Sequence, residues 1–172
     1  GLCRDEYPDT NHWPVQLYIR ECRRMTGAHV MTESDILRDK EKPDSIAMGS
    51  FVLDSHWVQR FATDQGFVRV EGHLDESINL SRNPYEIPYR SITPIESECG
   101  NLLVPVCLSA THVAICTIRM EPVYMMLGEA AGTAAAMSLG SKRTVQNIDV
   151  PELLRKLEAN GGILNRDRAT VP

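Results

Sequence analysis

The sequence lacks several patterns that would assign it to a functional class directly. Its five cysteines form no C-x-x-C, which argues against a zinc ribbon, a dithiol redox motif and a complete disulfide framework. We expect reduced and mostly buried thiols instead. The five histidines are widely spaced and form no H-E-x-x-H, so no metal site is predicted. No run of 18 charge-free apolar residues occurs, so a transmembrane helix is not expected.

Positive charge is also scarce. The chain has 18 Lys and Arg against 23 Asp and Glu, its net charge is −5, and no basic run is longer than the two residues of Arg23-Arg24. This pattern gives little support for nucleic-acid binding. The chain begins Gly-Leu-Cys, without Met and without a basic-then-apolar leader. We therefore expect an internal start, so that any targeting signal would lie outside the sequence and the compartment stays open.

The composition is that of a globular protein. Hydrophobic residues make up 42% and charged residues 24% of the 172 residues, which suits one domain or two small ones. Apolar periodicity predicts an α+β fold, a mixed α/β fragment with an antiparallel sheet. The predicted elements are a helix over 15–26, a hairpin over 46–72, a loop over 75–95, a buried strand over 101–108, and helices over 122–139 and 151–159.

The helix predicted over 122–139 carries the clearest signals. Pro122 suits a first turn, apolar residues recur at spacings of three and four, and Gly140 is a stop signal. Gly128 and Gly132 leave one face of this helix nearly bare, which lets a backbone or a flat ligand approach closely. Arg119 precedes the helix, whose N-terminus suits phosphate or an electron-rich ring. The alternative is a packed core helix with Arg119 capping a carbonyl.

Several segments together resemble a known family. They are QLYIRECRRM at 16–25, DSH at 54–56, IPYRSI at 87–92, NLLV at 101–104, SATH at 109–112 and IRMEPVYMMLGEAAGTAAA at 118–136. In this order they resemble bacterial FAD-dependent oxidoreductases related to glutathione-reductase-type flavoproteins and to the flavin subunit of heterodisulfide reductases. The similarity extends over residues 7–164. It implies FAD as cofactor and hydride transfer to or from flavin N5 on a small-molecule substrate.

The resemblance also implies roles for individual residues. The cofactor-binding residues would be Ser109, Thr111, Arg119, Met120 and Pro122. Residues 1–100 would form the substrate-side region, and residues 101–172 the C-terminal part of the FAD-binding domain with one strand and helices.

His112 is the candidate catalytic residue for proton transfer, and a structural imidazole is its alternative. Tyr89 and Arg90 are candidates for holding a polar or anionic substrate, and they could equally anchor their loop.

Two departures from the family pattern stand out. G-x-G-x-x-G, the phosphate-binding fingerprint, is absent from all 172 residues, and Pro105-Val106 replaces a usual polar contact to the cofactor. The chain is therefore expected to be the C-terminal part of a larger flavoprotein, inactive and without FAD by itself, whose missing partner is the N-terminal FAD-binding part. Its apolar helix face would then favour self-association. A non-catalytic binding or assembly module that kept the fold without the flavin is the alternative.

A hydrolase was also considered. Asp54-Ser-His56 suggests triad residues, but no G-x-S-x-G accompanies it, and triads are defined by geometry rather than by adjacency in sequence. The sequence therefore gives hydrolysis little support.

Overall fold

A computed structural model describes residues 5–16, 21–38, 42–55, 57, 59–72 and 83–165. The α+β prediction is confirmed, since helices accompany two small antiparallel sheets. The helices are α1 (Glu33–Ile36), α2 (His112–Ile118), α3 (Glu121–Ser141) and α4 (Val150–Ala159), with 3-10 turns η1 (Pro8–Thr10), η2 (Tyr89–Ser91) and η3 (Val145–Asn147). The strands are β1 (Ser45–Gly49), β2 (Gln59–Ala62), β3 (Val68–Glu71) and β4 (Tyr85–Pro88).

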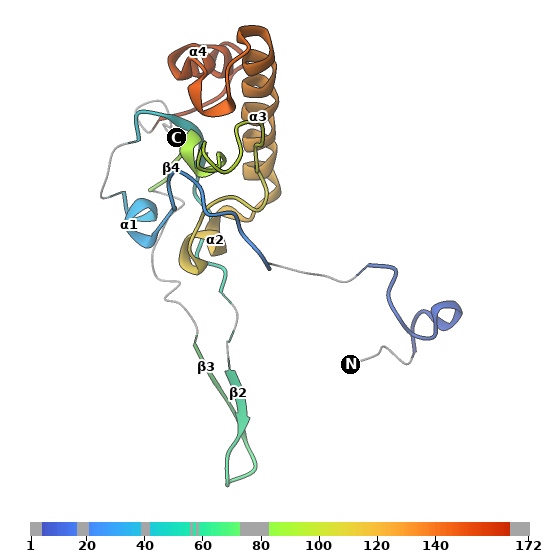
Figure 1. Cartoon of the computed structure of the whole chain (residues 1–172). Coiled ribbons are helices and arrows are strands. Elements are labelled where there is room, and N and C mark those ends of the chain that lie inside the picture. Colours follow the sequence, from blue (N-terminus) through green and yellow to red (C-terminus); the bar gives the residue numbers. More distant parts are fainter. Residues whose placement is uncertain are drawn as a thin grey trace.

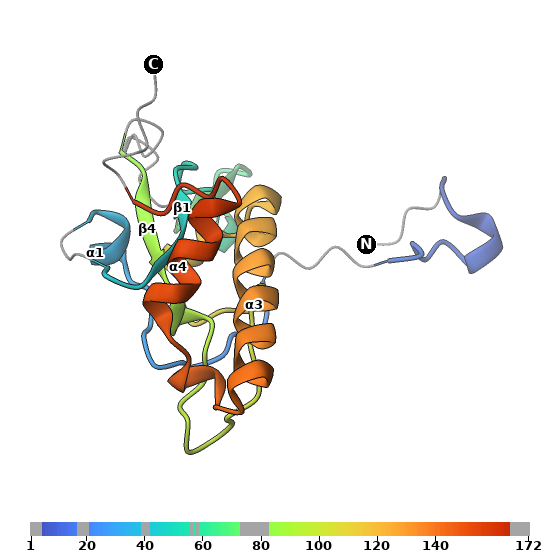
Figure 2. The same ribbon diagram turned by 90° about the horizontal axis from the view of Figure 1, so that it is seen from above.

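The β1–β4 ribbon lies between two helical layers. α3 and α4 pack against each other and against β1, while α1 contacts β4 from the other side (Figure 2). The β2–β3 hairpin projects away from this body, and η1 lies apart from it (Figure 1). One cluster of buried residues unites the layers, with Ile46 of β1, Leu127 of α3 and Leu153 of α4 among its members. This core draws on both sides of residue 100, and the predicted division there stays a prediction.

The pairing of β1 corrects the hairpin predicted over 46–72. β1 pairs with β4, while β2 and β3 form a hairpin with Gly66 at φ 79° in the turn. Gly49 lies opposite Tyr85, and a Cβ added to Gly49 would lie 2.4 Å from the tyrosine ring. The absent side chain therefore makes room for Tyr85, which is fully buried. The predicted loop over 75–95 likewise contains β4 and η2, and residues 75–82 lie outside the described residues.

Both C-terminal helices are confirmed, with adjusted ends. α3 extends to Ser141, so Gly140 lies inside it and Lys142 takes the left-handed conformation at its C-cap. In α4, the Asp149 side chain accepts a hydrogen bond from the backbone N–H of Glu152 at 2.9 Å, as expected of an N-cap.

The helix predicted over 15–26 is wrong within the described part of the chain. Residues 15–16 and 21–26 form no helix, and residues 17–20 lie outside the described residues. The backbone N–H of Met25 donates instead to Cys107 at 2.9 Å, and the Arg24 side chain bonds Ala110. These long-range contacts replace local helical bonds, because a short helix without a packed face is marginal. Gly27, which directly follows the predicted helix, lies where a Cβ would come within 2.5 Å of the Thr93 carbonyl oxygen.

The strand predicted over 101–108 does not form either. Its backbone makes separate bonds to two segments, from Val104 to Ile92 and from Met25 to Cys107, rather than a ladder. Pro105 has no N–H to donate in the middle of the run. Leu102 and Val106 are exposed, so burial on both faces is also incorrect.

Candidate functional site

The candidate site lies where α2 gives way to α3. Arg119 ends α2, Met120 is the N-cap of α3, and Pro122 occupies its first turn. Pro122 cannot donate a backbone hydrogen bond to Ile118, so the two helices do not continue into one another. The break places the predicted cofactor-binding residues of this segment at a helix junction.

Ser109 and Thr111 are held by protein partners just before α2. Ser109 is fully buried, and its hydroxyl accepts a hydrogen bond from the N–H of Gly27 at 2.9 Å. Its backbone bonds both Ser91 and Met31. Thr111 caps α2, with its hydroxyl oxygen 3.4 Å from the N–H of Ala114. Both residues therefore fix the loop that carries His112, and their predicted contacts to a cofactor stay predictions.

His112 opens α2, a helix that the sequence patterns did not predict. Its side chain is 52% exposed, and its Nδ1 lies 2.6 Å from Oε1 of Glu21. The other carboxylate oxygen of Glu21 pairs with Arg24, whose Nε donates to the Ala110 carbonyl at 2.8 Å. A carboxylate that orients an imidazole is a common arrangement for proton transfer.

Glu21 and Arg24, which contact the start of α2, were not among the residues predicted for the site. The resemblance of residues 16–25 to the family was the available signal. The helix predicted over 15–26 implied local contacts instead of a contact with His112. In the structure residues 21–25 form no helix, and the Glu21 side chain reaches the start of α2.

Arg119 is the most buried charged group at the junction. Its side chain is 7% exposed, and Nη2 contacts both the backbone oxygen of Asp54 and, at 3.2 Å, its carboxylate. Arg119 therefore binds a backbone carbonyl, that of Asp54, as the alternative interpretation expected. Its Nε, however, is buried and has no hydrogen-bond partner. A buried donor without a partner calls for an explanation, and a bound group is one of the standard ones.

The N-terminus of α3 is also open to a partner. Met120 supplies no side-chain cap, so the first N–H groups of this 21-residue helix lack a side-chain acceptor at that position. Glu121 adds a negative charge in the first turn, which partly offsets the helix dipole there. Pro122 is exposed beside it.

A small pocket is lined mostly by residues 21–24 and 106–107, with one residue each from α2 and α3. Its volume is about 150 Å³, below the 300–1,000 Å³ range typical of ligand sites. Burial raises the pKa of the Tyr124 phenol, which lines it. The remaining lining residues are Glu21, Cys22, Arg23, Arg24, Val106, Cys107 and Ile115. This pocket can hold a ring edge or a small group, but not a whole dinucleotide.

The predicted substrate-binding residues lie elsewhere, on η2. The Tyr89 hydroxyl donates to the backbone oxygen of Val145 at 2.7 Å, and Arg90 forms a fork with Asp44 through bonds of 2.9 and 3.1 Å. The hydrogen bonds to Asp44 raise the pKa of Arg90 above its usual value. Both residues thus anchor their segment. They also line an open pocket of about 610 Å³ that reaches Gln146 and Pro151, so a role in binding stays a prediction.

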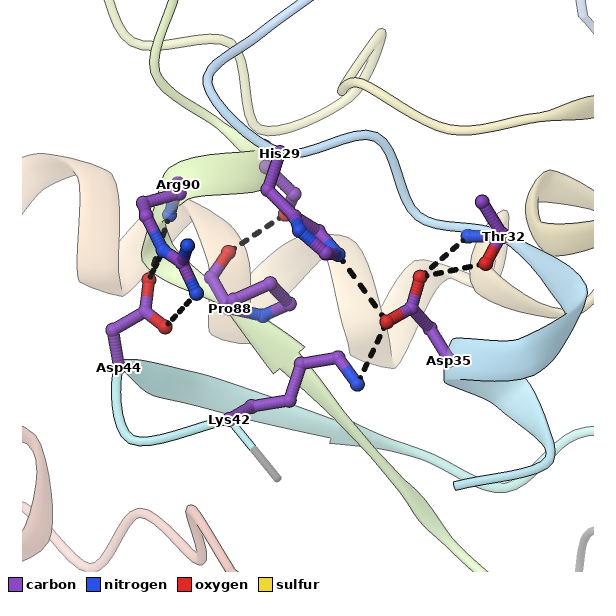
Figure 3. A network of polar contacts seen from close by, with 8 residues as sticks. His29, Thr32, Asp35, Lys42, Asp44, Pro88 and Arg90 are labelled. Atoms are coloured by element: carbon purple, nitrogen blue, oxygen red, sulfur yellow. Dashed lines mark hydrogen bonds and ion pairs between the residues drawn. The ribbon is translucent and has the colours of Figure 1, made fainter. Parts of the chain in front are cut away.

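A buried polar network extends beside Arg90 (Figure 3). Lys42 Nζ lies 2.8 Å from Oδ1 of Asp35, and both side chains are 3% exposed. Nε2 of His29 reaches the same carboxylate at 3.3 Å, and Thr32 donates to it twice. Burial raises the pKa of Asp35, but the hydrogen bonds from Lys42 and Thr32 and the charge of Lys42 outweigh it, so the pKa lies below its usual value.

The remaining candidates are the cysteines and the Asp54 segment. The thiols of Cys22, Cys99, Cys107 and Cys116 are free, and only Cys116 among them is buried, which corrects the expectation of mostly buried thiols. Asp54 pairs with Arg119, and His56, the other ionisable residue of the 54–56 motif, lies outside the described residues.

Comparison with known proteins gives one family. The FAD dependent oxidoreductase family matches residues 1–157. Neither the curated proteins nor the solved structures contain a match. Within the described residues, no helix combines the length and apolarity needed to cross a membrane. A match over so much of the chain supports a flavin-dependent redox function in general, and the chain belongs to the FAD dependent oxidoreductase family.

Proposed function

We propose that this chain forms the ring-side part of a flavin site in an oxidoreductase of the glutathione-reductase-type group, related to the flavin subunit of heterodisulfide reductases. The observation that carries the proposal is the partnerless Nε of Arg119, buried at the junction that leads into the uncapped N-terminus of α3. Both features supply N–H donors to a group with negative charge. The family match supplies the redox chemistry.

The residues present fit one end of FAD. Arg119, Met120 and the first N–H groups of α3 offer donors suited to the pyrimidine edge of the isoalloxazine. The bare face of α3 leaves room, because a Cβ added at Gly128 or Gly132 would meet nothing within 4 Å. The pyrophosphate has no matching G-x-G-x-x-G in these 172 residues.

When bound, FAD supplies a hydride acceptor or donor at N5. The chain's own residues would position the ring and transfer the proton. Arg119, held by Asp54, would place positive charge beside the ring, and Thr111 would keep the start of α2 in position. In the metal-free protein, Glu21 would fix the orientation of His112 through Nδ1, which leaves Nε2 to take up or release a proton of the substrate.

A flavin titration tests this assignment. Quenching of FAD fluorescence by the full chain should show weak binding, because pyrophosphate recognition is missing, and the preparation should be colourless. Arg119→Ala should weaken that binding further, while Arg119→Lys should keep part of it. Arg155→Ala is the matched control, because Arg155 is exposed on α4 and pairs with Glu152. Equal affinity in the wild type and in a folded Arg119→Ala would remove Arg119 from the site.

A non-catalytic binding or assembly module remains the second candidate. The observation that favours it is the absence of the phosphate fingerprint together with Pro105-Val106. It predicts no FAD binding at any concentration and a flavin-independent partner. The same titration therefore separates the two functions.

A further inference from the structure

The fold brings together three metal-ligating side chains that the sequence keeps apart. Glu21, His112 and Cys116 each offer one ligand atom, and these atoms lie within 4.8 Å of one another. Spacing in sequence predicted no metal site, because the histidines are dispersed and Glu21 is about 90 residues from α2. We propose that Glu21, His112 and Cys116 bind a zinc ion.

The elements position the three donors on one side of α2. His112 and Cys116 are four residues apart, so they lie on the same face of the helix, one turn from each other. Glu21 approaches that face from the extended segment before Gly27, with Oε1 2.6 Å from Nδ1 of His112. Bonds of about 2.0–2.3 Å to zinc require ligand atoms about 3.3–3.8 Å apart. Side-chain rotations that move the ligand atoms by about an ångström would therefore bring all three within bonding distance of one zinc ion.

The donor set favours zinc over other common cations. A thiolate and an imidazole suit zinc and related transition metals, whereas magnesium and calcium prefer oxygen ligands only. Three protein ligands leave a fourth position, as in catalytic rather than structural zinc sites. His112 is half exposed and Cys116 is buried, so the fourth position would face solvent on the His112 side.

Charge balance is compatible with a bound cation. Arg24 occupies only one oxygen of Glu21, and the positive charge of Arg119 is paired with Asp54. Burial raises the pKa of the Cys116 thiol, so the free protein carries the S–H form. Binding forms the sulfur–zinc bond as the S–H proton leaves to solvent. The thiolate and the carboxylate then neutralise the two charges of the ion.

Metal titration of the full chain tests the site without flavin. Zinc should bind with one equivalent per chain, and cobalt(II) in its place should give a sulfur-to-cobalt charge-transfer absorption. Cys116→Ser should abolish that absorption. His112→Ala, at an exposed position that tolerates truncation, should weaken zinc binding by more than the roughly 10-fold to 100-fold loss typical of losing an outer hydrogen-bond partner. Cys107→Ser is the matched control, because that thiol lines the adjacent pocket and is not part of the cluster.

The outcomes separate clearly. Absence of zinc binding overturns the proposal, and so does charge-transfer absorption that survives in Cys116→Ser or disappears in Cys107→Ser. Because Cys116 is buried, Cys116→Ala provides a second variant of different polarity, and both must keep the wild-type circular dichroism spectrum. Zinc binding is measured without FAD, so a chain that binds no zinc would leave the proposed flavin function intact. A chain that binds no FAD would in turn leave the zinc site intact.

Discussion

Arg119 and Asp54, which lie 65 residues apart in sequence, form a contact of 3.2 Å between Nη2 and a carboxylate oxygen. The guanidinium is 7% exposed and Asp54 is 38% exposed, so the pair lies at the edge of the core. Asp54 thus holds the guanidinium at the helix junction, while Nε keeps a free donor. Asp54, a triad residue in the hydrolase hypothesis, thus has a partner in Arg119.

The first prediction concerns this pair. Asp54→Ala should destabilise the chain by about 1–3 kcal/mol, because it leaves a buried guanidinium with fewer acceptors. Urea denaturation followed by circular dichroism measures the loss. Asp64→Ala is the control, since Asp64 lies exposed in the hairpin turn and should change the free energy of unfolding little. An unchanged midpoint for Asp54→Ala would show that Asp54 does not hold Arg119.

The second prediction concerns proton transfer. In protein saturated with added FAD and free of metal ions, His112→Gln should slow reduction of the flavin by substrate by roughly 10²-fold or more, because the general acid–base group is lost. Stopped-flow absorbance of the flavin gives the rate, and the bound flavin should stay at its wild-type level. Glu21→Gln should cause a smaller loss, since it removes only the partner that orients the imidazole. A near-normal rate in His112→Gln would make His112 a structural residue.

The third prediction concerns the buried pair of Lys42 and Asp35. Lys42→Met should destabilise the chain by about 3–5 kcal/mol at pH 7, because it leaves the Asp35 carboxylate buried without its cation. The folded-state pKa of Asp35 is lowered. Its stabilising contribution is therefore complete above the unfolded pKa of about 3.9, and it is lost as pH falls through the lower folded value.

Urea unfolding at pH 7 and across the acid range checks both parts of this prediction. The wild type should lose stability below about pH 4, and Lys42→Met should lose less over the same range. Lys156→Met on α4 is the matched control, because Lys156 is exposed beside Glu152. The prediction fails if the buried and exposed variants lose similar stability.

The fourth prediction concerns the open face of α3. Met125 is 73% exposed and Leu139 is 80% exposed on the side that carries Gly128 and Gly132. Such a face should drive self-association of the chain at high concentration. Sedimentation equilibrium should show dimers or larger species, and Met125→Glu with Leu139→Lys should shift them toward monomer. A monomer that binds no hydrophobic dye would contradict the prediction.

Local sequence determined α3 and α4 almost completely. Proline in the first turn, apolar residues at helical spacing and the Asp149 cap act over a few residues, so their signals are readable without the fold. The β2–β3 hairpin was readable for the same reason, because Gly66 sets a local turn. The FAD-dependent oxidoreductase family could also be inferred from short segments, and the match over residues 1–157 confirms that family but not the subgroup.

Only the tertiary structure decided the partners of the other segments. Residues 21–26 look helical but bond residues 107–110, and β1 joins β4 across a long connection instead of β2. The contacts of Glu21 with His112 and of Asp54 with Arg119 have the same origin. Periodicity reports which face of an element is buried, whereas the choice among distant partners depends on the packing free energy of the whole chain, which no local window contains.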